Sequence, residues 1–144
     1  MATERKANVV WHGDLMNGNG TIESVTSGAF APLDVSWPSR SEEPNGKTSP
    51  EELIAAAWAA CFSMALSHGL AQSGHPAETL ETSATVTFQP GEGITKGALT
   101  VRATVPGIEP GEFDAAAETA KQNCPVSKAL SGIPEVTLDA SLAA

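Results

Sequence analysis

The stretch that decides the fold runs from Ser49 to Leu66 and reads SPEELIAAAWAACFSMAL. Ser49 suits the N-cap of a helix, and Pro50 suits its first position, where the missing N–H group of proline costs nothing. Glu52 follows Ser49 by three residues and completes a capping box, in which each side chain can hydrogen-bond the other residue's backbone N–H group. The pattern therefore predicts a helix that starts at Pro50.

The residues that follow extend this helix to about Gly69 or Gly74. Its apolar run, from Leu53 to Leu66 with one serine inside it, is well short of the roughly 20 residues that a membrane-spanning helix needs. We therefore expect a long buried central helix. Because this helix is apolar all round and the chain is small, it needs cover on two sides, which favours a homodimer.

Shorter elements are predicted on both sides of the helix. Strands at Asn8–Trp11 and Leu33–Trp37, around the turn-rich Asn17–Gly20, indicate an N-terminal β meander. Residues Pro38–Ser49 contain almost no apolar side chain and predict an exposed loop. The later elements are further antiparallel strands, over Thr79–Phe88, Ile94–Val105 and Val136–Leu142, and shorter helices over Glu112–Lys121 and from Cys124 to about Leu130. The predicted fold class is α+β, in one domain over residues 1–144.

The charge of the chain limits its partners. Its 144 residues hold 17 acidic and 8 basic side chains, which gives a net charge of −9 at pH 7. Such an acidic chain is a poor partner for nucleic acid or an anionic membrane. The charged N-terminus does not lead into an uninterrupted apolar stretch, so we expect no secretory signal and place the protein in the cytoplasm.

Two cysteines are the candidate reactive groups. A permanent disulfide is not expected in a reducing compartment, and two thiols are too few for a zinc site of four thiolates. Cys61 lies in mid-helix, where an unpaired cysteine is often a small apolar filler. Cys124 precedes Pro125 at a helix start, where the helix dipole and the nearby Lys121 and Lys128 favour a thiolate. Transient redox chemistry and inert packing both remain open.

Glu51 is the candidate carboxylate. The capping box accounts for Glu52, whereas Glu51 either complements the helix dipole or acts in a site. Glu51 and Cys61 are ten residues apart, or about 15 Å along a helix that rises 1.5 Å per residue. A glutamate side chain cannot close that gap. If both residues act in one site, Glu51 must come from a second copy of the chain.

The histidines are weaker candidates. His68 lies seven residues after Cys61 and roughly 10 Å further along the helix, which is a poor spacing for a base or a shared metal site. His12 and His75 adjoin glycines and indicate turns. We expect no metal site.

Four motifs occur in order along nearly the whole chain. They are Trp11-His12-Gly13-Asp14 with Gly18 and Gly20, Thr48-Ser49-Pro50-Glu51-Glu52-Leu53, Ala59-Ala60-Cys61-Phe62-Ser63-Met64-Ala65-Leu66, and Cys124-Pro125-Val126-Ser127. Together they resemble the OsmC/Ohr family of organic hydroperoxide reductases, and its OsmC branch in particular. The order and separation of the two cysteine motifs make this resemblance specific.

The resemblance implies an intertwined α+β homodimer with active sites at the subunit interface. Carried over to the matching positions, it makes Cys61 the thiol that attacks the peroxide and Cys124 the thiol that resolves the sulfenic acid as a disulfide. The glutamate of the family follows the proline of the helix start, which selects Glu51. The arginine of the OsmC branch lies in the preceding loop, where Arg40 is the match. An external dithiol, of lipoyl type, then reduces the disulfide, and no cofactor is implied.

The leading prediction is thus a thiol-dependent peroxidase that reduces organic hydroperoxides and hydrogen peroxide through a cysteine sulfenic acid. A guanidinium near Cys61 stabilises its thiolate, and a carboxylate orients the guanidinium. Local electrostatics alone favour Cys124 as the more acidic thiol, whereas the resemblance assigns the attack to Cys61. Two alternatives are a non-enzymatic stress protein that senses oxidation or binds a ligand, and a chain in which both thiols are inert.

Overall fold

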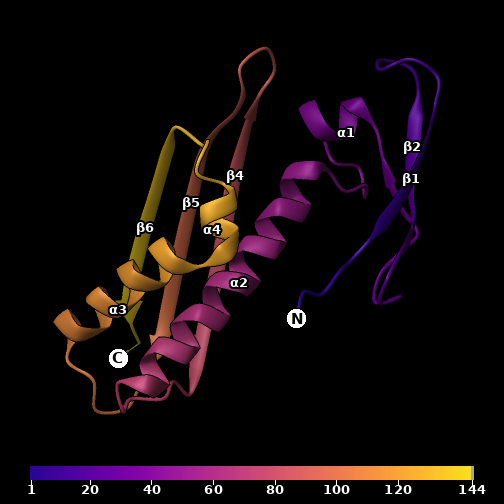
Figure 1. The fold of residues 1–144 in the computed structure, drawn as a ribbon. Helices are drawn as coiled ribbons and strands as arrows, with labels where there is room; N and C mark the ends of the chain where they lie inside the picture. Colours follow the sequence, from indigo (N-terminus) through magenta and orange to yellow (C-terminus); the bar gives the residue numbers. More distant parts are fainter. Residues whose placement is uncertain (144) are drawn as a thin grey trace. The chain divides into compact units, whose positions relative to one another are not determined.

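The computed structural model describes residues 1–143. The chain forms two compact units, residues 1–53 and a second unit that starts at Ile54, and each is described by itself. Helices and strands occur together, so the predicted α+β class is confirmed (Figure 1). A single domain over residues 1–144 stays a prediction.

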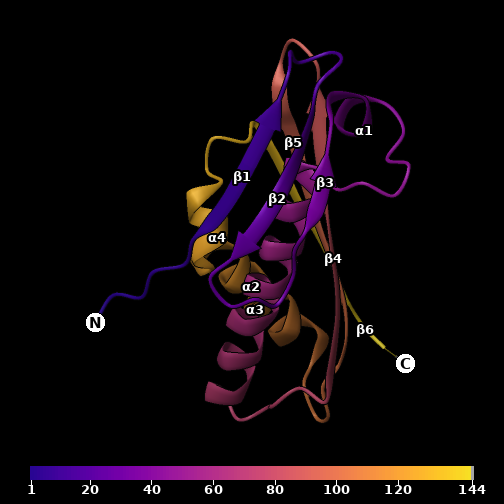
Figure 2. The same ribbon diagram turned by 90° about the vertical axis from the view of Figure 1, so that its right-hand side faces the viewer.

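The first unit opens with a three-stranded antiparallel sheet. Strands β1 (Ala7–His12), β2 (Asn19–Val25) and β3 (Leu33–Val35) pair in this order. Figure 2 shows them side by side as the predicted meander. The third strand ends earlier than expected, because Trp37 already belongs to a helix. The turn predicted over Asn17–Gly20 is also shorter than expected, because Asn19 and Gly20 already belong to β2.

Trp11 of β1 packs closely on Gly20 of β2. A Cβ atom at Gly20 would lie 2.6 Å from Cε3 of Trp11 and 3.1 Å from Cγ2 of Val35, so the indole comes this close only because residue 20 is a glycine. Trp11 Nε1 also donates to the carbonyl oxygen of Gly13 at 2.9 Å. The tryptophan and glycines of the first motif therefore hold the β1–β2 hairpin together.

A short helix, α1 (Trp37–Ser41), occupies the start of the predicted loop Pro38–Ser49, and the loop prediction is wrong there. Ser36 is the N-cap, since its Oγ accepts the N–H of Ser39 at 3.2 Å and Ser39 Oγ accepts the N–H of Ser36 at 3.1 Å. This is a capping box with serine where glutamate or glutamine is usual. Ser39 is buried, and so is Thr48 at the other end of the segment.

Helix α2 (Pro50–Gln72) is the predicted long helix, and Ser49 Oγ accepts the N–H of Glu52 at 3.1 Å as expected of its N-cap. The helix packs along one stripe and is not buried all round, since Met64 on another side is 73% exposed. Among residues 1–143 it is the one helix long and apolar enough to cross a bilayer, yet its stripe belongs to the core. The stripe repeats every four residues and consists of Trp58, Phe62, Leu66 and Leu70.

The second unit contains another three-stranded sheet. Strands β4 (Thr79–Gln89) and β5 (Gly93–Thr104) form the predicted antiparallel hairpin. Strand β6 (Glu135–Leu142) pairs with β5 in parallel, where further antiparallel strands were predicted. The connection explains the difference, because a helical crossover between β5 and β6 returns the chain to the end of the sheet where β5 began.

This crossover contains helices α3 (Pro110–Asn123) and α4 (Pro125–Ala129), as predicted, with Cys124 as the C-cap of the first and the N-cap of the second. Figures 1 and 2 show α3, α4 and the part of α2 within the second unit on one face of the sheet. The core lies between these layers. Besides the α2 stripe it contains Leu99, Val101, Ala103, Val105, Ile108, Phe113, Ala117, Ala120 and Cys124.

Candidate active site

The first unit brings two candidate residues together. Arg40 stands in the last turn of α1, and Glu51 stands in the first turn of α2. Arg40 Nη2 donates to Oε2 of Glu51 at 2.8 Å, and its Nε donates to Oε1 and Oε2 at 3.0 and 3.2 Å. The Glu51 side chain is 7% exposed and that of Arg40 is 31% exposed. The carboxylate is thus sheltered and holds the guanidinium in a fixed plane.

The neighbouring Glu52 has a different partner. Its Oε1 accepts a hydrogen bond from Thr48 Oγ1 at 2.8 Å, and the residue is exposed. Glu52 therefore closes the helix start, while Glu51 holds Arg40. The sequence left both a dipole role and a site role open for Glu51, and the ion pair is what distinguishes the two adjacent glutamates.

The second unit brings the two cysteines together. Both thiols are free, and Cys61 of α2 is hydrogen-bonded to Cys124 at the α3–α4 junction. Cys124 is fully buried, whereas Cys61 is partly exposed. This order is opposite to the one expected from position alone, in which Cys61 has the profile of a core filler. The reason is that α2 buries only one stripe, and Cys61 lies beside it.

The surroundings of the two sulfurs decide which thiol is the more acidic. Burial raises the pKa of the Cys61 thiol, and its hydrogen bond to Cys124 raises that pKa further, against the opposing effect of the Val126 N–H group. Burial also acts to raise the pKa of Cys124. Hydrogen bonds from Cys61, from the N–H and hydroxyl groups of Ser127 and from the Val126 N–H group outweigh it, so the pKa of Cys124 is lowered.

Cys124 is therefore the more acidic thiol of the pair, because its pKa is lowered while that of Cys61 is raised. The expectation that local electrostatics make Cys124 the more acidic thiol is confirmed. The N–H groups that lower the pKa of Cys124, those of Val126 and Ser127, belong to the first turn of α4, of which Cys124 is the N-cap.

Ser127 and Trp58 contribute to this site although the sequence did not single them out for it. Ser127 is the third residue after Cys124, at the N3 position of α4, from which a side chain can reach back to the N-cap. Trp58 Nε1 donates to Ser127 Oγ at 2.7 Å. The spacing of Cys124 and Ser127 is a signal that points to the serine. No local sequence signal predicts the contact of Trp58 with Ser127, because the two residues are 69 positions apart.

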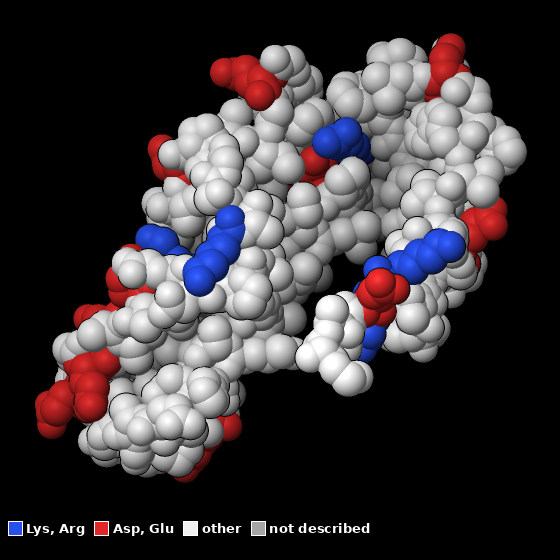
Figure 3. Space-filling model, in the orientation of Figure 1, with Lys and Arg blue, Asp and Glu red and all other residues white. Residues whose placement is uncertain are grey.

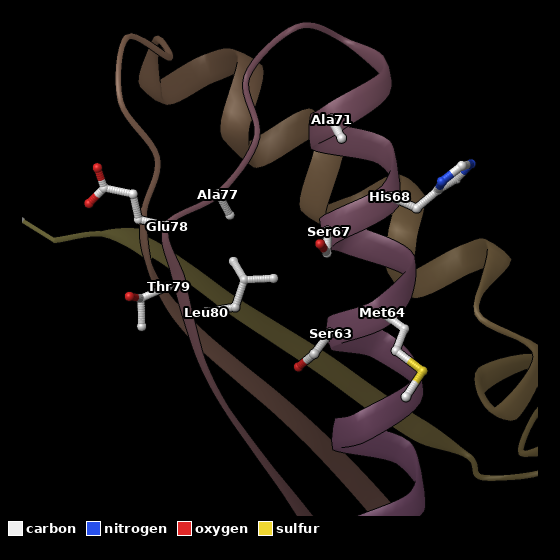
Figure 4. A pocket seen from close by; sticks show the side chains of 9 residues that line it. All are labelled: Ser63, Met64, Ser67, His68, Ala71, Ala77, Glu78, Thr79 and Leu80. Atoms are coloured by element: carbon white, nitrogen blue, oxygen red, sulfur yellow. The ribbon is translucent and has the colours of Figure 1, made fainter.

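A separate groove of about 590 Å³ lies between α2 and the start of β4, and neither cysteine lines it. Figure 4 shows Ser63 and Leu80 facing the groove, while the ring of His68 points away from it. His75 Nε2 lies 3.4 Å from Oε1 of Glu112. These histidine positions agree with the weak case for a catalytic histidine.

Charged side chains form no broad basic surface on the face shown in Figure 3. Acidic side chains are spread over it, in keeping with the 17 acidic and 8 basic residues of the chain. Within the described residues 1–143, no group of three or more His, Cys, Asp and Glu side chains is arranged to hold a metal ion.

The chain matches the family model of the OsmC-like protein over residues 43–139. It is 41% identical over 145 aligned residues to Peroxiredoxin OsmC of Escherichia coli (strain K12), which covers 99% of both chains. The chain belongs to the OsmC-like family. The resemblance drawn from the motifs is thereby confirmed, and the matched range of the OsmC-like model includes Glu51, Cys61 and Cys124 but not Arg40.

Other relatives of this OsmC-like chain agree. It is 34% identical to Organic hydroperoxide resistance protein OhrA of Bacillus subtilis (strain 168), over 80% of this chain and 84% of that protein. The crystal structure of an organic hydroperoxide resistance protein OsmC from Legionella pneumophila matches with a TM-score of 0.64 and 28% identity, over 96% of this chain and 97% of that one. The similarity thus extends over nearly the whole fold.

Proposed function

We propose that this OsmC-like protein is a cysteine-dependent peroxidase that reduces organic hydroperoxides and hydrogen peroxide. The observation that carries the proposal is the hydrogen-bonded pair of free thiols, Cys61 and Cys124. Relatives that are 41% and 34% identical are named a peroxiredoxin and an organic hydroperoxide resistance protein, which supports the same activity.

In the proposed first step, the thiolate of Cys61 attacks the distal oxygen of the peroxide. The S–O bond forms, the O–O bond breaks, and the leaving alkoxide takes a proton and departs as an alcohol, or as water from hydrogen peroxide. Cys61 is oxidised to a sulfenic acid, and the peroxide is reduced by two electrons.

In the second step, the thiolate of Cys124 attacks the sulfur of the Cys61 sulfenic acid. The S–S bond forms, the S–O bond breaks, and hydroxide leaves as water after protonation. Cys124 is suited to this role because its pKa is lowered, which makes it the more acidic thiol of the reduced pair. An external dithiol, which we propose to be of lipoyl type, then reduces the disulfide and restarts the cycle.

The first step needs a cation beside Cys61, because burial and the hydrogen bond to Cys124 raise the pKa of that thiol. We assign this role to Arg40, whose guanidinium stabilises a thiolate and offers N–H donors to the peroxide oxygens. Glu51 orients it through the bonds of 2.8 to 3.2 Å. The pair is thus pre-organised before a peroxide binds.

We further propose that the active protein is a cytoplasmic homodimer in which Arg40 and Glu51 of one protomer act on Cys61 of the other. The 15 Å or so of helix between Glu51 and Cys61 supports this arrangement. Exposed apolar side chains on both units also favour a second copy as cover. They include Val9, Val10, Trp11, Phe30 and Met64.

A steady-state assay with an organic hydroperoxide and excess dithiol tests the activity. We expect turnover in the unmodified protein and its loss in Cys61→Ser. Undiminished turnover by that variant contradicts the assignment. A non-enzymatic sensor instead consumes about one equivalent of peroxide per thiol pair and then stops, so turnover number separates the two functions.

Subunit complementation tests the shared site. Arg40→Met and Cys61→Ser are each expected to be inactive alone. If Arg40 acts across the interface, a mixed dimer contains one intact site, and random mixing restores about a quarter of the activity per chain. No recovery, in a mixture shown by mass spectrometry to contain the mixed dimer, places Arg40 and Cys61 of the active site in the same chain.

A further inference from the structure

The hydroxyl group of Ser127 has two polar neighbours, and their chemistry sets the direction of its proton. An indole N–H group can only donate, so in the 2.7 Å bond from Trp58 Nε1 the serine oxygen is the acceptor. The proton of Ser127 is therefore available to a second partner. That partner is the sulfur of Cys124, the N-cap of α4 three residues earlier, because the Ser127 hydroxyl acts to lower the pKa of this thiol.

The indole that orients Ser127 is itself held in place. Trp58 is 1% exposed and belongs to the core stripe of α2. Against it lies Gly97 of β5, where a Cβ atom would come within 2.7 Å of Cζ3 and 2.8 Å of Cη2 of the ring. The close approach of β5 thus fixes the indole ring, and the ring fixes the serine oxygen as an acceptor, which leaves the serine proton free to turn toward the sulfur of Cys124.

We propose that Trp58 and Ser127 are positioning residues that keep Cys124 as the stabilised thiolate, both when it closes the disulfide and when it leaves during reduction, and that they thereby direct the reducing dithiol to Cys61. The inference rests on the proposed function for the disulfide cycle. It assigns to Trp58 and Ser127 a task that they perform through the sulfur of Cys124.

The reduction step follows from this difference between Cys61, which is attacked, and Cys124, which leaves. A thiolate of the dithiol attacks Sγ of Cys61, and the S–S bond breaks. The electron pair of that bond leaves with Cys124, and the resulting thiolate accepts a hydrogen bond from the Ser127 hydroxyl. The second thiol of the reductant then attacks the mixed disulfide, releases Cys61 and forms the disulfide of the oxidised reductant. Exchange is faster when the departing sulfur is the better-stabilised thiolate.

Access favours the same direction of attack. Cys124 is fully buried at the α3–α4 junction, whereas Cys61 is partly exposed on α2. An incoming dithiol therefore meets Cys61 first. Two independent features, the exposure of Cys61 and the stabilisation of the Cys124 thiolate, thus both favour attack at Cys61 and departure of Cys124.

The first experiment is a titration of the reduced protein and needs no peroxide. In Cys61→Ser the hydroxyl replaces the thiol donor, and Cys124 is the single remaining thiol, so its thiolate absorbance is followed against pH. Adding Ser127→Ala is expected to move the midpoint upward, Ser127→Thr to keep it low, and Ser131→Ala, a serine in the same turn region, to leave it unchanged. A midpoint that Ser127→Ala does not move overturns the proposal.

Trp58→Phe separates orientation from packing, because it keeps an aromatic ring and removes only the N–H donor. We expect the midpoint to move upward here too, although the serine hydroxyl is still present. Circular dichroism checks that each variant folds. If Trp58→Phe leaves the midpoint where it was while the protein stays folded, Trp58 has no positioning role.

The second experiment asks which sulfur the reductant attacks. The disulfide is made with a chemical oxidant, exposed to a monothiol, quenched with acid, and mapped by peptide mass spectrometry. We expect the adduct on Cys61, and a roughly tenfold slower reduction in Ser127→Ala, the effect of one hydrogen bond to a charged group. Adducts on Cys124 overturn the proposed direction. Because no peroxide is used, failure here leaves the peroxidase assay as a separate result.

Discussion

Replacement of Glu51 by glutamine removes the charge that holds Arg40 and keeps the shape of the side chain. The carboxylate accepts from Arg40 Nε at 3.0 and 3.2 Å and from Nη2 at 2.8 Å, and it is 7% exposed. Loss of one partner from a buried ion pair costs about 3 to 5 kcal/mol. The Arg40 side chain is 31% exposed and can regain water, and the amide oxygen of glutamine still accepts one bond. We therefore expect a smaller loss, about 1.5 to 3 kcal/mol.

Glu52→Gln is the matched control, because it changes the adjacent residue in the same way. Its carboxylate is exposed and accepts from Thr48 Oγ1 at 2.8 Å, so we expect a loss below about 1 kcal/mol. Urea unfolding followed by circular dichroism gives both free energies from the midpoint and slope. Arg40→Met completes a double-mutant cycle with Glu51→Gln, which isolates the coupling between the two side chains.

The same variants report on activity. If Glu51 orients Arg40 for the reaction, kcat/KM for a hydroperoxide falls by about tenfold or more in Glu51→Gln and stays near its original value in Glu52→Gln. Equal unfolding free energies in the two glutamine variants, or an additive cycle with Arg40→Met, refute the reasoning about the ion pair. Equal activities refute its role in the proposed site.

Three further changes test the second unit, each by urea unfolding. The unfolding free energy of Cys61→Ser, measured relative to that of Cys61→Ser/Cys124→Ser, should rise with pH between the lowered pKa of folded Cys124 and the ordinary pKa of a thiol. The reason is that the folded state binds fewer protons than the unfolded state in this pH range. A difference that stays flat or falls with pH contradicts this. Gly97→Ala should cost about 1 to 3 kcal/mol, since its Cβ would lie 2.7 Å from Trp58, and an unchanged midpoint argues against the close contact. Phe62→Ala should cost about 3 to 5 kcal/mol because the ring is fully buried, and a loss under 1 kcal/mol would mean that the stripe is poorly packed.

Local signals predicted much of the fold. The start of α2 is readable because a cap, a proline and a glutamate act within one turn, and the β4–β5 hairpin is readable from two-residue periodicity. Helix α1 escaped prediction because its capping box uses Ser39 at the position where glutamate or glutamine is the usual signal. The parallel pairing of β6 escaped because strand direction depends on a crossover and not on the strand's own residues.

The candidate site divides in the same way. Motifs were enough to name Cys61, Cys124, Glu51 and Arg40 as candidates. They did not reveal that Glu51 forms an ion pair with Arg40 while the adjacent Glu52 accepts a hydrogen bond from Thr48. Both glutamates lie in the first turn of α2 and differ only in the direction of their side chains.

The sequence by itself determined that a long helix carries one cysteine, that the other begins a short helix, and which family the motifs resemble, because caps, periodicity and motif order act over a few residues. Only the tertiary structure decided that the cysteine in mid-helix is the more exposed one and has the raised pKa. Burial and hydrogen bonding set both properties. They depend on the packing of α2 against the α3–α4 junction, where Cys61 meets Cys124 and Trp58 meets Ser127 only after the chain has folded.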